Sequence, residues 1–272
     1  MLLCNNGNFL PAGVPLLTSS NRSFKWGDGL IETIRVQGGQ IPLWPFHAER
    51  LFGSMKLLKM DRGDHLKEEE IFEQIVQLCH ENHCASGSRV RLAVYREENN
   101  EAGYVIEALP LPKESIGWNE KGLMLGLYPY AHKPLDGLSN LKTASALPYI
   151  MAGLHAKENG ADDCIVLNSA NGIADTSRAN IFLVKSGKVF TPALNQGCVA
   201  GVMRRYCIEG LKKMGIPVHQ EALNPEELLH AEEVFLTNAV QGLRWVRSFQ
   251  EKEYSYAFST GIYTSMISTI FP

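Results

Sequence analysis

The segment SNLKTASALPYIMA, from Ser139 to Ala152, places a single lysine between a polar loop and an apolar run. Lysine is seldom buried unless it is paired or used chemically. At the edge of an apolar wall, the pKa of its amine can fall into a chemically useful range. Lys142 is therefore either a reactive amine or an ordinary side chain that extends from a strand end to water. The other segments of the chain indicate which of these two interpretations is correct.

The segments after this lysine predict a strand-rich region. LPYIMAGLHAKENG predicts a helix that ends at a glycine, and DDCIVLN, GIADTS and ANIFLVKSGKVFTPA predict strands joined by Asn-Gly and Ser-Gly turns. GVMRRYCIEGLKKMG predicts a helix between Gly201 and Gly215, and EEVFLTNAVQGLRWV predicts another strand or a pair of strands. The C-terminal segment is expected to be helical.

The segments before the lysine predict a smaller α+β unit. ETIRVQGGQIPLW predicts a hairpin of two strands around Gly38 and Gly39. PFHAERLFGSMKLLKM and EEEIFEQIVQLCHENH predict helices, and RVRLAVYRE and AGYVIEALP predict further strands. LPLPKESIGWNEKG, with its prolines, glycines and mixed charge, is typical of a linker. We therefore predict a small α+β domain over 1–112, an interdomain linker over 113–121 and a large strand-rich domain over 122–272.

Composition narrows the functional classes. The 272 residues are 45% hydrophobic and carry a net charge of −3, so no broad basic surface indicates nucleic acid or an anionic membrane as a partner. We expect no membrane span and no signal peptide. The six cysteines have no paired spacing, which favours reduced thiols and a cytoplasmic location. The run CHENHC, Cys79 to Cys84, could hold a metal, but four ligands within so short a helical stretch strain a tetrahedral site, and we expect no metal.

Four features could act together on one ligand. Arg50 could clamp a phosphate, and the helix start at Gly201 offers free N–H groups to the same anion. Lys142 could hold a carbonyl as a Schiff base, and the carboxylate of Asp175 could hold a proton on a ring nitrogen. Each residue alone also fits an ordinary structural role. Phosphate, aldehyde and basic nitrogen are the groups of pyridoxal phosphate, whose ring is an electron sink.

The order of these motifs resembles the class IV aminotransferase family of pyridoxal-phosphate enzymes, which contains branched-chain and D-amino-acid aminotransferases and aminodeoxychorismate lyase. The similar segments are, in order, FKWGDGLIETIRVQGGQI, HAERL, LKTASALP, ADTSRANIFLV, VAGVMRRYCIE and EVFLTNAVQGLRWV. The resemblance implies pyridoxal 5'-phosphate as cofactor. It also implies a two-domain α+β fold, with a small N-terminal α/β sandwich and a larger C-terminal strand-rich pseudo-barrel.

The resemblance also implies roles for individual residues. Lys142 would be the Schiff-base lysine and general base, Arg50 would bind the phosphate, and Asp175 would face the ring nitrogen. The other implied cofactor-binding residues are Val199, Gly201, Val202, Met203, Asn238 and Ala239. Two residues depart from the family pattern: Asp175 replaces the usual glutamate and Met203 replaces the usual threonine. Both changes raise the alternative of a catalytically idle relative that still binds the cofactor.

The reaction depends on the substrate pocket. Leu147 stands where branched-chain aminotransferases have a tyrosine, and Ile31 stands where D-amino-acid aminotransferases have one. Arg96 aligns with an arginine in the substrate loop of the lyase and could meet a substrate carboxylate. We therefore predict a lyase that converts aminodeoxychorismate to p-aminobenzoate and pyruvate, in folate precursor synthesis, with an amino-acid aminotransferase as the alternative. The family further implies a homodimer that acts on a small-molecule amine, with a site between the two domains.

Overall fold

The computed structural model describes residues 1–271, which fall into two compact units. The first unit comprises Met1–Ile116 and Leu141–Ser145, and the second comprises the rest of the described chain. The chain passes from one unit to the other after Ile116, inside the predicted linker 113–121. The sequence placed Leu141–Ser145 in the domain 122–272, whereas the structure groups this segment with the first unit.

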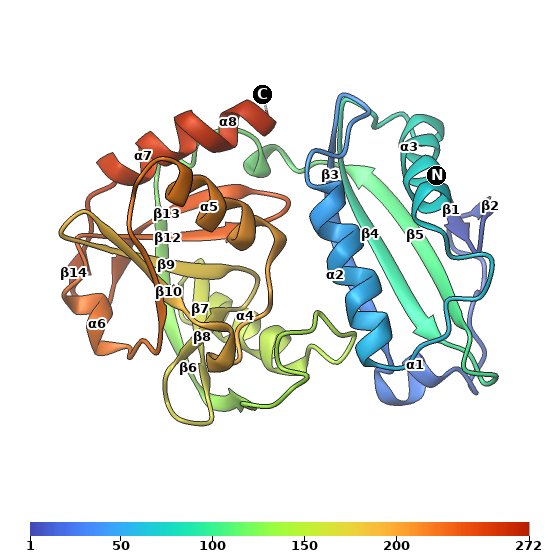
Figure 1. Cartoon of the computed structure of the whole chain (residues 1–272), viewed down its shortest axis with the longest axis horizontal. Helices are drawn as coiled ribbons and strands as arrows, with labels where there is room; N and C mark the ends of the chain where they lie inside the picture. Colours follow the sequence, from blue (N-terminus) through green and yellow to red (C-terminus); the bar gives the residue numbers. More distant parts are fainter. Residues whose placement is uncertain (272) are drawn as a thin grey trace. The chain divides into compact units, whose positions relative to one another are not determined.

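Within the described residues, the first unit is a five-stranded antiparallel sheet in the order β2-β1-β5-β4-β3, and two of its helices, α2 and α3, lie on the same face (Figure 1). Its elements are β1 (Leu2–Asn5), β2 (Asn8–Pro11), α1 (Arg22–Trp26), β3 (Gly29–Gln37), α2 (Trp44–Leu57), α3 (Glu68–Glu81), β4 (Gly87–Arg96) and β5 (Ala102–Pro110).

The alternation of β3 explains how this layer is built. Leu30, Ile34 and Val36 are buried on one face, where they join the core formed with α2 and α3. Because side chains alternate along a strand, Glu32 points to this same apolar face. Three glutamates in the first turn of α3 suit the positive end of the helix dipole. Glu32 on β3, in contrast, is buried and has no such surface explanation.

One predicted element is wrong. The second strand of the predicted hairpin does not form, because after Gly38 and Gly39 the chain makes only a single bridge, between Gln37 and Gln40. The strand partner of β3 is β4 instead. Pro42 and Pro45 lack the N–H donors that a ladder needs. The residues between the turn and α2 therefore connect the two elements without pairing.

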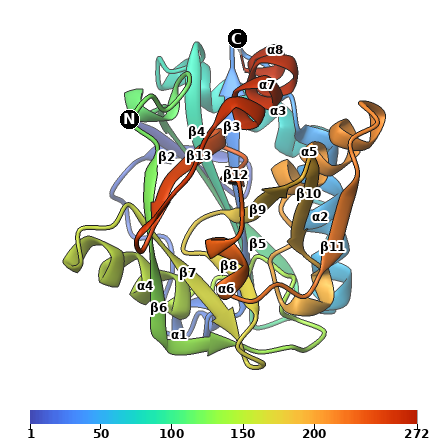
Figure 2. The same cartoon turned by 90° about the vertical axis from the view of Figure 1, so that its left-hand side faces the viewer.

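The second unit is built on a nine-stranded sheet, counted over the described chain, in the order β11-β10-β9-β12-β13-β6-β7-β8 with β14 paired to β13 (Figure 2). Its elements are β6 (Leu123–Lys133), α4 (Leu147–Glu158), β7 (Asp163–Asn168), β8 (Ile173–Thr176), β9 (Asn180–Lys185), β10 (Lys188–Pro192), α5 (Val202–Lys213), β11 (Val218–Glu221), α6 (Glu226–Leu229), β12 (Glu233–Asn238), β13 (Gly242–Phe249), β14 (Lys252–Glu253), α7 (Ala257–Ile262) and α8 (Ser268–Ile270). The predicted α+β fold, with a strand-rich larger part and a helical C-terminal segment, is confirmed.

The cysteines and helices can be compared with the expectations about metal binding and membrane spans. All six cysteines are buried free thiols, and burial raises the pKa of Cys79 to about 11. Cys79 and Cys84 belong to the core of the first unit, and no group of three or more His, Cys, Asp or Glu side chains within residues 1–271 could hold a metal ion. Over the same residues, none of the helices combines the length and the apolar character needed to cross a membrane.

Candidate active site

The lysine segment is attached to the outer edge of β3. The N–H of Ile31 donates to the Lys142 carbonyl at 2.9 Å, and the N–H of Ala144 donates to the Gly29 carbonyl at 2.9 Å. β4 occupies the other edge of β3, so these two bonds use the edge that the sheet leaves open. They fix Lys142, which is partly buried, beside Ile31, the predicted substrate residue.

Arg50 lies on α2 opposite the acid of β3. Its Nε donates to Glu32 Oε1 at 2.8 Å and its Nη2 donates to Glu32 Oε2 at 2.5 Å, a bidentate pair. His47, one helical turn earlier, contacts Glu32 Oε2 through Nδ1 at 2.6 Å. The first unit therefore holds the predicted phosphate arginine in a buried network with two residues to which the sequence assigned no role.

The electrostatics of this network follow from burial and charge. Burial alone would raise the pKa of Glu32, but the Arg50 cation and the His47 hydrogen bond bring it down to about 2. Burial lowers the pKa of His47, although the bond from Glu32 opposes this effect. The positive charge of Lys142 also lowers the pKa of His47. Near neutral pH the network thus contains an ionised Glu32 and a neutral His47 beside the Arg50 guanidinium.

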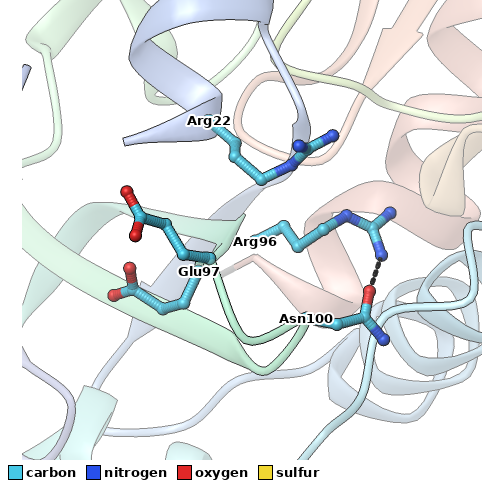
Figure 3. A pocket seen from close by; sticks show the side chains of 5 residues that line it. Arg22, Arg96, Glu97 and Asn100 are labelled. Carbon is cyan, nitrogen blue, oxygen red and sulfur yellow. Dashed lines mark hydrogen bonds between the residues drawn. The ribbon is translucent and has the colours of Figure 1, made fainter. Parts of the chain in front are cut away.

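Arg96 lies in a different part of the first unit, in a pocket lined by Arg22, Arg96, Glu97, Glu98 and Asn100 (Figure 3). Its Nε donates to Asp28 Oδ2 at 2.9 Å, its Nη2 donates to the Leu58 carbonyl at 2.8 Å, and its Nη1 contacts Asn100 Oδ1 at 2.5 Å. Burial alone would raise the pKa of Asp28, but bonds from Arg96 and Arg22 hold it below its usual value. The guanidinium of Arg96 thus ties local segments together, and its binding of a substrate carboxylate stays a prediction.

Asp175 is the buried carboxylate of the second unit. It lies on β8 with 2% of its surface exposed. Its Oδ2 accepts from Tyr149 Oη at 2.7 Å and from the Val199 N–H at 2.9 Å, and its Oδ1 accepts from Asn180 Nδ2 at 2.8 Å. These donors come from α4, from β9 and from the loop before α5. Three separate segments therefore fix one carboxylate.

The charge of Asp175 is balanced in part by a buried amine. Burial raises the pKa of Asp175, and the nearby Lys133 cation acts in the opposite direction. Lys133 Nζ lies 3.7 Å from Asp175 Oδ2 and donates to the Ser139 carbonyl at 2.8 Å. Burial and the neighbouring Asp175 carboxylate raise the pKa of Tyr149 well above its ordinary value, so its hydroxyl stays a donor. Burial outweighs these partners, so the pKa of Asp175 stays above its ordinary value although each partner donates or carries positive charge.

At the start of α5, a neighbouring side chain lies very close to the backbone of the helix. Gly201 is the N-cap residue, and no side chain caps this helix. A Cβ at Gly201 would overlap Asn180 Oδ1, so only glycine fits here. The first N–H groups of a helix have no partner within the helix, which makes Val202 and Met203 backbone donors for an anion. The Met203 side chain is 1% exposed and lies in the core, so this residue can act only through its backbone.

The predicted residues Asn238 and Ala239 form the turn after β12. Asn238 Oδ1 accepts from the Gln241 N–H at 2.8 Å and from the Val240 N–H at 3.1 Å. The side chain of Asn238 therefore holds its own turn. Thr237, the preceding residue, pairs across the sheet with Asn180, which bonds Asp175. One edge of the second unit thus gathers the carboxylate, the glycine start of α5 and this turn.

The chain belongs to the class IV aminotransferase family. The family described as Amino-transferase class IV matches residues 29–249, a stretch that contains Arg50, Lys142 and Asp175. The comparisons therefore confirm the family to which the sequence motifs pointed.

Individual relatives include both lyases and transaminases. Aminodeoxychorismate lyase of Vibrio harveyi is 30% identical over 91% of this chain and 92% of its own length. Aminodeoxychorismate lyase of Bacillus subtilis is 26% identical over 98% of this chain and 92% of its own length. The structure of the branched-chain aminotransferase of Thermoproteus uzoniensis has a TM-score of 0.88 at 22% identity, covering 100% of this chain and 95% of that one. Other relatives are named D-alanine aminotransferase.

Pyridoxal 5'-phosphate is the cofactor of this family, and the residues present fit it. A solvent-shielded carboxylate with three donors suits a protonated ring nitrogen. The uncapped, glycine-led start of α5 suits a phosphate. Lys142, held against the open edge of β3, has an amine of the kind that an aldehyde needs. Each of the three groups of the cofactor therefore has a complementary group in the chain.

Sequence reasoning missed the residues that surround the predicted ones. Glu32 offered a usable signal, because an acid on the core face of a strand is rarely without a partner. Asn180 belongs to a motif that was recognised, yet its bond to Asp175 was not predicted. Tyr149 and Lys133 gave no sequence signal, since only the fold brings α4 and β6 to β8.

Proposed function

We propose that the protein is a pyridoxal-phosphate-dependent lyase that converts aminodeoxychorismate to p-aminobenzoate and pyruvate, and thereby supplies a folate precursor. The observation that carries this proposal is the 30% identity with a relative named aminodeoxychorismate lyase over 92% of its length. The replacement of the pocket tyrosines of the transaminases by Ile31 and Leu147 supports the same reaction.

In this proposal each residue has a defined task. Lys142 would hold the aldehyde of the cofactor through Nζ and would act as general base. Asp175, held by Tyr149 and Asn180, would keep the ring nitrogen protonated. When bound, the cofactor ring supplies the electron sink that the bond cleavage needs.

The phosphate would be bound by a second set of groups. Arg50 contributes a guanidinium, and Val202, Met203 and the turn at Asn238 and Ala239 contribute backbone donors. Val199 supports the ring end of the site, since its N–H already holds Asp175.

An amino-acid aminotransferase is the second candidate, and the names of the D-alanine and branched-chain relatives favour it. The assay that separates the two supplies aminodeoxychorismate without any keto acid. We expect release of pyruvate and p-aminobenzoate in equal amounts. An aminotransferase would instead consume the visible absorbance of the bound cofactor when it receives an amino acid alone. An idle relative, which Asp175 and Met203 suggest, would bind the cofactor and turn over neither amine.

We also propose that the enzyme is a cytoplasmic homodimer. The exposed face of α4 supports association, because Leu147, Ile150, Met151 and Leu154 lie at helical spacing and are each at least 42% exposed. Ala152 and Ala156 on the opposite face are buried against β6 and β7. A second copy of the chain, which presents the same stripe, is the occupant that this proposal requires. The buried free thiols are consistent with a reducing compartment.

A further inference from the structure

We propose that Glu32 and His47 are positioning residues that set the orientation of Arg50 before a phosphate arrives. This inference rests on the proposed function, because it assumes that Arg50 binds the cofactor phosphate. It assigns roles to a buried acid on β3 and a buried imidazole on α2.

The first argument is geometric. An arginine side chain is long and flexible, and a free guanidinium samples many directions. Glu32 accepts from both Nε and Nη2 of Arg50, so the plane of the guanidinium is defined by a two-point contact. The Glu32 side chain is 3% exposed and that of Arg50 is 11% exposed, so water competes little for these bonds. Arg50 is therefore oriented in advance, and binding does not have to order it.

The second argument concerns His47. Because the pKa of Glu32 is about 2, its carboxylate is ionised and can only accept hydrogen bonds. Burial keeps His47 neutral, so the 2.6 Å contact requires the tautomer with its proton on Nδ1. His47 thus holds Glu32 Oε2, the same oxygen that accepts from Arg50 Nη2. The imidazole orients the acid, and the acid orients the guanidinium.

The third argument is the place of this chain of contacts in the fold. Glu32 directly follows Ile31, whose N–H holds the Lys142 carbonyl. Adjacent residues of one strand therefore hold the backbone of Lys142 and the guanidinium of Arg50. The charge of Lys142 reaches His47, which places the imidazole within electrostatic range of that amine.

The test compares two probes that differ only in the phosphate, pyridoxal 5'-phosphate and pyridoxal, each titrated into the cofactor-free full chain by fluorescence. The variants are Glu32→Gln, His47→Leu and His47→Asn, in which the asparagine amide retains a donor near Nδ1. Glu107→Gln, which removes an exposed ion pair with Arg91 on the same sheet, is the matched control. Thermal unfolding confirms that each variant is folded.

We expect Glu32→Gln and His47→Leu to weaken pyridoxal phosphate by about tenfold or more, and pyridoxal by less than about twofold. His47→Asn and Glu107→Gln should bind both probes like wild type. If Glu32→Gln does not fold, the comparison of His47→Leu with His47→Asn still tests the inference. Wild-type affinity for the phosphate in His47→Leu, or an equal loss of both probes, would overturn the inference. A wild-type chain that binds neither probe would overturn the proposed function itself, and that result is distinct from a failure of Glu32 alone.

Discussion

Two buried carboxylates, one in each unit, organise the site residues, and their surroundings shift their pKa values in opposite directions. Glu32 is paired with a guanidinium, and its pKa falls to about 2. Asp175 has neutral donors and an amine at 3.7 Å, and burial raises its pKa. The first carboxylate is therefore a fixed charge. The charge of the second depends on its donors, which makes those donors sensitive points for mutation.

Replacement of Tyr149 by phenylalanine tests the donors of Asp175. The change removes a hydrogen bond to a buried carboxylate, so we expect a loss of about 1.5–3 kcal/mol in the free energy of unfolding. The pKa of Asp175 should rise further, and cofactor affinity should fall. Urea unfolding and cofactor titration measure the two effects. Tyr254→Phe, which removes a phenol bonded to the Leu228 carbonyl, should leave cofactor affinity unchanged. Equal cofactor affinity in the two variants would contradict this account.

Acid titration tests Glu32. Its pKa is lowered from 4.5 to about 2 in the folded chain, so it adds stability that is complete above pH 4.5 and is lost as the pH falls towards 2. The contribution is roughly 3 kcal/mol by linkage. We expect the unfolding free energy of Glu32→Gln to vary less with pH across this window than that of wild type. The two pH profiles should run parallel if Glu32 is not ionised and paired, and parallel profiles would refute the assignment.

At the scale of elements, the backbone at the first residue of a helix positions the neighbouring groups of the site. Gly201 begins α5 against Asn180, and the bond from Asn180 to Asp175 depends on that fit. We expect Gly201→Ala to cost about 1–3 kcal/mol by overpacking and to weaken cofactor binding. Gly53→Ala on α2, where an added Cβ meets nothing within 4 Å, should be neutral or stabilising. Denaturant unfolding of both variants gives the comparison, and an equal effect at the two glycines would count against the close packing at α5.

The elements also separate what sequence could predict from what it could not. Periodicity predicted α2, α3, α4 and α5, because each has an apolar stripe or clear end signals. It failed for the strand after Gly39, since apolar residues near prolines suit a buried connection as well as a strand. Periodicity could not predict that the Lys142 segment lies against the open edge of β3, because the sequence of an extended segment does not show which strand it will contact.

The same limit applies to the site. Lys142, Arg50 and Asp175 were assigned from the order of the motifs, and their roles at the cofactor stay predictions. Tyr149, Lys133 and His47 were not, since their roles depend on contacts between segments far apart in the chain. Glu32 lies between the two cases. Its position on the core face of β3 could be predicted from the sequence, but its partner could not.

At the scale of the whole molecule, the exposed stripe of α4 predicts association. Introducing a charge into an apolar interface is costly, so we expect Leu154→Glu to convert a dimer to a monomer. The variant should fold normally, because Leu154 is 48% exposed in the single chain. Light scattering coupled to size exclusion measures the mass, with exposed Lys213→Glu on α5 as the control. A wild-type monomer, or an unchanged dimer in Leu154→Glu, would contradict the proposed interface.

The most direct measurement of the central claim is to locate the covalent attachment of the cofactor. The chain is loaded with pyridoxal phosphate, reduced with borohydride, digested and analysed by peptide mass spectrometry. The account predicts one modified peptide, with the phosphopyridoxyl group on Lys142, and no such peptide from Lys142→Ala. Attachment at Lys133 or another lysine, or no attachment at all, would contradict it.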